Sequence, residues 1–112
     1  MSDIRFQVSG RGAREIAAKF GAMIEGEFGR RAETQEKEGT FSLTLPAALL
    51  TVEDATRHRG LAEKLSRLIG VARWEYRNGI EISVRGANDD KGAWVRLDEA
   101  EPSTLLEMAA KK

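Results

Sequence analysis

The longest regular pattern in the chain is an apolar stripe at helical spacing between Thr51 and Gly79. Side chains with apolar surface recur there every three or four residues, and the set consists of Ala55, His58, Leu61, Ala62, Leu65, Leu68, Ile69, Ala72 and Tyr76. Thr51 followed by Asp54 is typical of a helix start, and Asn78 followed by Gly79 is typical of a helix end. The pattern therefore predicts one long central helix with a broad apolar face.

Alternating apolar and polar positions predict four strands around this helix. They cover residues 4–8, 40–45, 80–85 and 93–97. Apolar residues at helical spacing predict a first helix over about residues 11–28, and Pro102 suits the start of a short terminal helix. The resulting order is βαβαββα. We expect an α+β fold, a small two-layer sandwich in which a four-stranded sheet is packed by the long central helix.

The segment from Gly29 to Gly39 has almost nothing to bury. It is bounded by glycine and carries charges of both signs. We therefore expect an exposed, mobile loop over about residues 29–39. A length of 112 residues suits one domain with one core, so we expect residues 1–112 to form a single domain.

Charge and composition narrow the class of protein. Eighteen basic residues balance eighteen acidic ones, so the formal net charge is zero, which removes a bulk electrostatic argument for binding nucleic acid. Arginine outnumbers lysine by twelve to six, and arginine is enriched in protein interfaces. The composition therefore favours a binding function.

The chain carries no visible signal for export or membrane insertion. The first residues lack a basic segment followed by an apolar one, and no apolar run approaches the roughly 18 residues that a membrane span needs. There is no cysteine, so disulfides and thiolate metal sites are excluded and a reducing compartment is allowed. We expect a cytoplasmic protein with no membrane partner.

Two features could carry chemistry, and each has a structural alternative. Gly10-Arg11-Gly12 follows a strand and precedes a helix, as in phosphate-binding loops, but Glu15 stands where the third glycine of such loops lies. His58, the single histidine, lies on the apolar face of the long helix, where a core or boundary histidine is the ordinary case. No nucleophile, base and orienting group share a recognisable spacing. We therefore expect no enzyme activity, no catalytic residue, no metal site and no cofactor.

The outward side of the long helix is the first candidate binding surface. On a helical wheel Trp74 lies opposite Leu65. Its neighbours on the outward side are Arg67, Val71 and Arg77. An exposed aromatic side chain ringed by arginine has the composition of a binding hot spot. In the alternative interpretation another helix covers Trp74, which is then part of the core.

The outward face of the sheet is the second candidate surface. The alternation that sends Val95 inward sends Trp94 and Arg96 outward, together with Arg85 of the preceding strand. Arginine with an aromatic residue on an open sheet can stack the bases of a single-stranded nucleic acid. The alternatives are a protein partner or a covering helix, and the acidic Glu81 on the same face favours these.

The C-terminal half holds a succession of short motifs. A helix that contains an aromatic residue is followed by the strand Gly79–Gly86, a polar turn, the segment Trp94–Asp98, and Pro102 before two leucines. This succession, over roughly residues 60–110, resembles the closing section of the effector-associated constant component domains of bacterial conflict systems, and the strand Ile4–Val8 is compatible with it. The resemblance implies a non-catalytic adaptor that couples a sensor to a separate effector such as a protease, with no active site.

Together these observations predict a small, non-catalytic protein-interaction or adaptor module, which in a bacterial defence system would couple a sensor to an effector. Its partner is another protein or a second copy of the chain. The expected contact residues are Arg67, Val71, Trp74, Arg77, Arg85, Trp94 and Arg96. The alternative is a nucleic-acid-binding domain that uses the arginine and aromatic face of the sheet, and the zero net charge is the main objection to it.

Overall fold

The computed structural model describes residues 3–30, 32–50, 55–87 and 92–110, with the backbone alone for residues 55–58. The elements in chain order are β1 (Ile4–Gly10), α1 (Ala13–Phe28), β2 (Glu33–Lys37), β3 (Thr40–Leu45), η1 (Ala47–Leu50), α2 (Ala55–Arg77), β4 (Ile80–Gly86), β5 (Val95–Arg96), η2 (Leu97–Glu99) and α3 (Pro102–Ala110). The strands form one antiparallel sheet of order β2-β3-β1-β4-β5. The predicted α+β class is confirmed.

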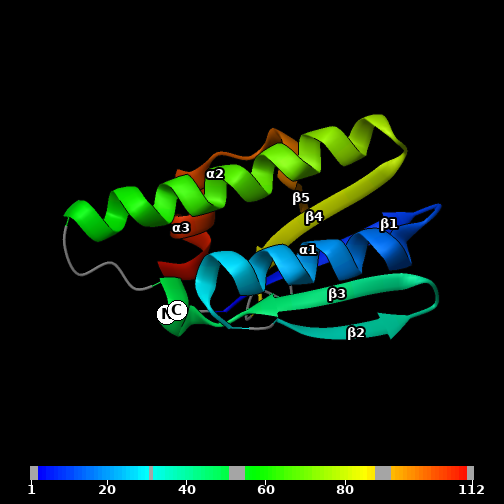
Figure 1. Ribbon diagram of the computed structural model, residues 1–112, viewed down its shortest axis with the longest axis horizontal. Coiled ribbons are helices and arrows are strands. Elements are labelled where there is room, and N and C mark those ends of the chain that lie inside the picture. The colour runs from blue at the N-terminus through cyan, green and yellow to red at the C-terminus, as the bar shows by residue number, and fades with distance from the viewer. Residues whose placement is uncertain (1–2, 31, 51–54, 88–91, 111–112) are drawn as a thin grey trace.

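The three α-helices of the described chain pack on one face of this sheet (Figure 1). Because the helices cover one face only, burial alternates along β1, whose odd and even positions face opposite sides of the sheet. Ile4, Phe6 and Val8 are fully buried beneath the helices, whereas Arg5 and Gln7 on the opposite face are only half-buried. No described helix covers that opposite face, so the sheet has one packed side and one open side.

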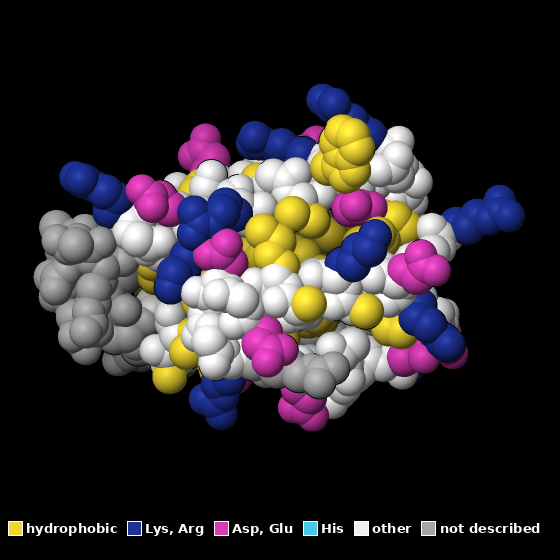
Figure 2. Space-filling view, viewed as in Figure 1, with side chains coloured by type: hydrophobic (Ala, Val, Ile, Leu, Met, Phe, Trp, Pro, Cys, Tyr) yellow, Lys and Arg dark blue, Asp and Glu magenta, His cyan; other side chains and the backbone are white. Residues whose placement is uncertain are grey.

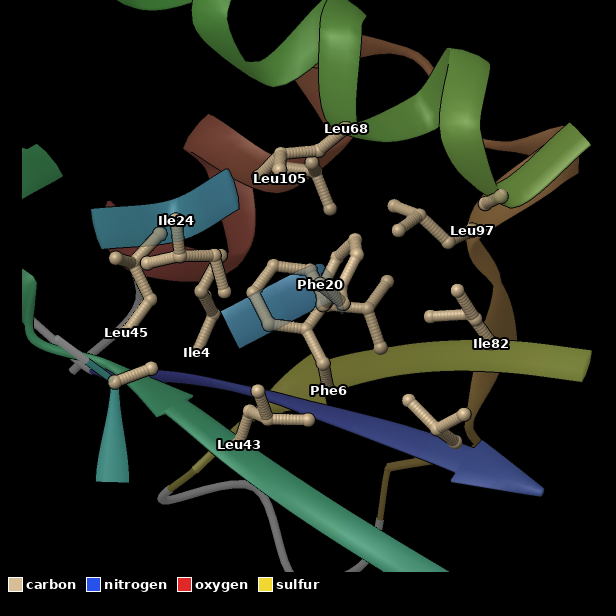
Figure 3. Packing of buried hydrophobic residues seen from close by; sticks show 14 of the residues in the cluster. Ile4, Phe6, Phe20, Ile24, Leu43, Leu45, Leu68, Ile82, Leu97 and Leu105 are labelled. Carbon is tan, nitrogen blue, oxygen red and sulfur yellow. The ribbon is translucent and has the colours of Figure 1, made fainter. Parts of the chain in front are cut away.

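The hydrophobic core fills the space between the central strands and the helices (Figure 3). Phe6 of β1 meets Phe20 of α1 edge to face, with ring centroids 5.1 Å apart and ring planes at 73°. Leu68 of α2 and Leu105 of α3 approach the same space from the other helices, and both are fully buried. β1 is therefore the strand around which the packed side is built.

The long central helix agrees with its predicted stripe. Its buried residues include Leu61, Leu65, Leu68, Ile69 and Ala72. The helix ends at Arg77, and Gly79 has a φ of +86°, the left-handed conformation expected where the helix stops. The predicted start at Thr51 and Asp54 lies outside the described residues, and so does the side chain of His58.

The prediction of a loop over residues 29–39 is wrong in its central part. Residues 33–37 form β2, which pairs antiparallel with β3 along its whole length, so the sheet has five strands instead of four. The order of the elements is βαββαββα instead of βαβαββα. All five residues of β2 are exposed. The strand therefore buries no side chain, and this is why its sequence lacks the apolar alternation that marks the other strands.

A tight turn holds β2 in register with β3. Lys37 pairs with Thr40, and Glu38 and Gly39 make the two-residue connection between them. Both connecting residues have positive φ, +53° and +80°, which is the conformation of the type I′ hairpin turn that matches the twist of paired strands. The turn and the backbone hydrogen bonds therefore form this hairpin without help from burial.

The last strand is shorter than predicted. The expected strand over residues 93–97 is reduced to β5, Val95–Arg96, because the chain turns directly into η2. Leu97 is fully buried from that helical turn instead of from a strand. The predicted hairpin is real, since Val84 and Val95 face each other across β4 and β5.

Candidate interaction surfaces

Trp74 is the most exposed large hydrophobic side chain in the described part of the chain, at 64%. It lies on the side of α2 away from the core. One turn earlier stands Gly70, where an added Cβ atom would meet no atom within 4 Å. Arg77, also exposed, follows as the last residue of α2. Of the two alternatives for Trp74, the structure shows the exposed one.

Apolar side chains gather between α1 and α2, and one of them, Val71, lies one helical turn before Trp74. Ile16 and Met23 of α1 and Val71 of α2 are half-buried and pack against the core. Figure 2 shows hydrophobic surface gathered between the two helices, with charged side chains around it. We call Ile16, Met23, Val71, Gly70 and Trp74 the α1–α2 face.

Arg67, expected to contact a partner, is engaged within the domain. Its Nε donates to Oε1 of Glu27 and its Nη2 donates to Oε2, both at 2.7 Å. This forked ion pair joins α2 to α1 along the border of the α1–α2 face. The guanidinium is therefore held in one orientation, and half of the Arg67 side chain stays exposed beside the apolar strip.

The same ion pair makes the stability of the domain depend on pH. The hydrogen bond from Arg67 lowers the pKa of Glu27. A carboxyl group whose pKa is lower in the folded chain stabilises the fold above its unfolded pKa, and this contribution is lost as the pH falls through the folded pKa. We therefore expect Glu27→Gln to be less stable than wild type at about pH 7, with a smaller difference at about pH 3, where the carboxyl group of the unfolded chain is protonated. Urea unfolding midpoints at both pH values measure this, and an equal difference at both would contradict it.

The open side of the sheet brings Arg85 and Trp94 together. The Arg85 guanidinium lies over the Trp94 ring, with its Cζ 4.5 Å from the centroid. Both side chains are half-buried. Directly opposite Arg85 in the register is Arg5 of β1, which was not among the predicted contact residues. The open side therefore has two arginines at opposite positions of neighbouring strands and an indole stacked with one of them.

Arg96 does not join this group. Its Cζ lies 3.8 Å from the centre of the Tyr76 ring on α2. It also donates to both carboxylate oxygens of Asp98, at 3.2 and 2.6 Å, and forms an ion pair with Glu99 at 3.3 Å. The hydrogen bonds to Asp98 raise the pKa of Arg96. Through these contacts within the domain, the Arg96 guanidinium connects β5 to η2 and α2.

Tyr76 was predicted on the apolar face of α2 and is 44% exposed instead. The wheel angle of this residue is close to that of the buried Ala72, but Tyr76 lies in the last turn of the helix. The guanidinium of Arg96 stacks on its ring there, so the ring lies between a cation and water and not among core side chains. The helical spacing alone could not show this partner.

The remaining candidate features gain no support from the geometry. Gly12 caps α1 without a side-chain hydrogen bond, and Arg14 in the first turn forms an exposed ion pair with Glu36 at 3.6 Å. In the described part of the chain no three His, Cys, Asp or Glu side chains come together as metal ligands. Within the same residues, no helix combines the length and apolar character needed to cross a bilayer.

Comparison of the chain with known proteins identifies no similar protein. No protein family, no curated protein and no solved structure matches the chain. The resemblance to the effector-associated constant component domains therefore stays a prediction.

Proposed function

We propose that this chain is a small, non-catalytic protein-binding module whose contact surface is the α1–α2 face. The observation that carries the proposal is the 64% exposure of Trp74 beside the half-buried strip of Ile16, Met23 and Val71. Tryptophan is, with tyrosine and arginine, one of the residue types that most often dominate the free energy of a protein interface. An exposed indole contributes no burial free energy to the folded domain, and a partner that covered it would supply that burial.

Gly70 supports this proposal. A glycine in the interior of a helix destabilises it by about 1 kcal/mol relative to alanine. At Gly70 the packing of the domain does not require this, because a Cβ atom would meet nothing within 4 Å. The glycine leaves open space next to Trp74, through which a partner can approach both the indole and the helix backbone.

The forked ion pair supports it as well. Arg67 is held by Glu27 before any partner arrives, at two distances of 2.7 Å. A side chain that is already ordered loses less conformational entropy on binding than a free one. The border of the α1–α2 face is therefore preorganised, with the apolar strip inside it and a charged rim beside it.

The wider role in this proposal is that of a cytoplasmic adaptor in a bacterial defence system, which rests on the resemblance of residues 60–110. Self-association through the α1–α2 face is a variant of the same role. In either case the domain contributes a surface and not an active site.

The test compares wild type with Trp74→Ala. Light scattering at two concentrations measures self-association, and affinity capture from the extract of the source cells, quantified by mass spectrometry, identifies protein partners. We expect Trp74→Ala to weaken the wild-type interaction by about thirtyfold, as for an interface hot spot, and to leave the free energy of unfolding within about 0.5 kcal/mol of wild type. Arg59→Ala, at another exposed position of α2, is the control that retains binding.

Gly70→Leu gives an independent check. An added Cβ atom meets nothing within 4 Å, and leucine favours a helix more than glycine does, so we expect the variant to be more stable by about 1 kcal/mol. We expect it to bind the partner more weakly, because leucine then occupies the space beside Trp74. The proposal would be contradicted if both Trp74→Ala and Gly70→Leu bound the partner as tightly as wild type. It would also be contradicted if every interaction of the wild type persisted in Trp74→Ala.

A further inference from the structure

Two arginines stand directly opposite each other on the open side of the sheet. Arg5 of β1 and Arg85 of β4 are antiparallel partners, so their Cβ atoms lie roughly 5 Å apart. Like charges in such a position destabilise a sheet. Among the residues that the structure describes, neither guanidinium has an acidic partner. The repulsion between them is not offset within this part of the chain.

Arg85 is oriented by stacking and not by hydrogen bonds. Its guanidinium lies 4.5 Å from the centroid of Trp94, a contact that fixes the plane of the group. Its Nε is buried and has no hydrogen-bond partner among the described residues, which is unfavourable for a charged donor. An anion bound by Arg5 and Arg85 together would offset the repulsion between their two charges.

The rest of this face is small and polar. The register places hydroxyl and amide side chains on the three central strands beside the arginine pair, namely Gln7, Ser9, Thr40, Ser42, Thr44 and Ser83. Glu81, opposite Ser9, is the acidic position of these three strands on that face. The face therefore offers an arginine pair next to Trp94 and a floor of polar side chains, with Glu81 on β4 and with Glu33 and Lys37 on the edge strand β2 as further charged positions.

We propose that this face binds a single-stranded nucleic acid, with one phosphate group held jointly by Arg5 and Arg85. Single-stranded nucleic acids bind across sheet faces, where guanidinium groups hold phosphates and polar side chains meet sugars and bases. An extended peptide instead adds to a sheet edge, where backbone donors and acceptors are free. Arg5 lies on β1, which is paired on both sides, by β3 and by β4, and has no free edge. This site is separate from the α1–α2 face and does not depend on it.

One shared phosphate predicts a particular dependence on salt. The logarithm of the association constant falls with the logarithm of salt concentration with a slope of about −0.7 for each phosphate neutralised on a single strand. We therefore expect a slope of about −0.7 and weak binding that is measurable only at low salt. A chain of zero net charge is compatible with such local binding.

The test uses a ten-nucleotide single-stranded RNA labelled with fluorescein, with binding followed by anisotropy at low salt. In a Trp74→Phe background the fluorescence of Trp94 gives a second, local signal. We expect Arg5→Gln and Arg85→Gln each to weaken binding by about tenfold or more and to flatten the salt slope. Arg59→Gln, exposed on α2, is the matched control and retains binding.

Stability separates loss of binding from loss of the fold. Because Arg5→Gln removes the repulsion with Arg85, we expect it to melt at the same temperature as wild type or higher. Absence of binding at low salt would overturn the proposal, and so would unchanged binding by both variants or a slope much steeper than about −1.4. If a glutamate-rich peptide displaced the RNA as well as unlabelled RNA does, the face would belong to an acidic protein, and the proposal would be overturned.

Discussion

Phe6→Ala is expected to lower the free energy of unfolding by about 3–5 kcal/mol. Phe6 is fully buried in the central strand β1, and its ring packs edge to face on Phe20 at 5.1 Å. Truncation removes the burial of the ring and leaves a cavity between the sheet and α1 that a close-packed core closes only in part. A domain of this kind has about 5–15 kcal/mol of stability in total, so the variant loses a large share of it.

Urea unfolding followed by circular dichroism measures this effect. Phe28→Ala is the matched control, because Phe28 is the same residue type at the end of α1 and is only half-buried. We expect its loss to be clearly smaller, since part of its ring is in water before the substitution. If the two variants lost the same stability, Phe6 would not hold the central place in the core that the packing gives it.

Gly10→Ala is expected to lower the free energy of unfolding by about 2–5 kcal/mol. Gly10 ends β1 with a φ of +118°, which is unfavourable for a residue with a Cβ atom. It pairs with Ile80, and an added Cβ would lie only 2.5 Å from the carbonyl oxygen of Gly79. That oxygen belongs to the backbone, so the end of β1 must move away from the start of β4.

Gly12→Ala separates the cost of the positive φ from the cost of the close contact with Gly79. Gly12 also has a positive φ, +86°, but an added Cβ would meet nothing within 4 Å. We expect this variant to lose only the conformational part, about 1–2 kcal/mol. Unfolding free energies of the two variants then differ by the contribution of the close contact with Gly79, and equal losses would show that the strands separate there without resistance.

Elements that bury an apolar face could be predicted from the sequence. The alternation in β1 and the stripe of α2 are both produced by the requirement that one side of the element leaves water. The buried positions Phe6, Leu65 and Ile69 follow from that requirement alone. The glycines after β1 and α2 could be assigned to turns for the same local reason, because left-handed backbone favours glycine.

β2 could not be predicted in this way, because none of its side chains is buried. Its formation depends on a neighbour, β3, and on the positive φ of Glu38 and Gly39. Asparagine or aspartate before glycine is the usual signal of such a turn. Glutamate in that place does not give it. The exposure of residues 33–37 was predicted correctly, and the strand that they form was missed.

The candidate surfaces divide along similar lines. The outward position of Trp74 follows from the helical wheel. The partners of the arginines do not, because Arg67 meets Glu27 across 40 residues of chain. Likewise, the opposition of Arg5 and Arg85 requires the strand order, in which β1 lies next to β4. Spacing indicates which side a residue takes, and the tertiary fold decides which groups it meets.

The one-sided covering of the sheet also fixes how the two proposed ligands relate in space. The α1–α2 face looks out from the helical layer, whereas Arg5 and Arg85 lie on the back of the sheet, with the core between them. If both proposals hold, the protein and the nucleic acid would occupy the domain back to back, and neither would displace the other. In such a ternary complex the domain would act as a spacer that raises the local concentration of one macromolecule near the other.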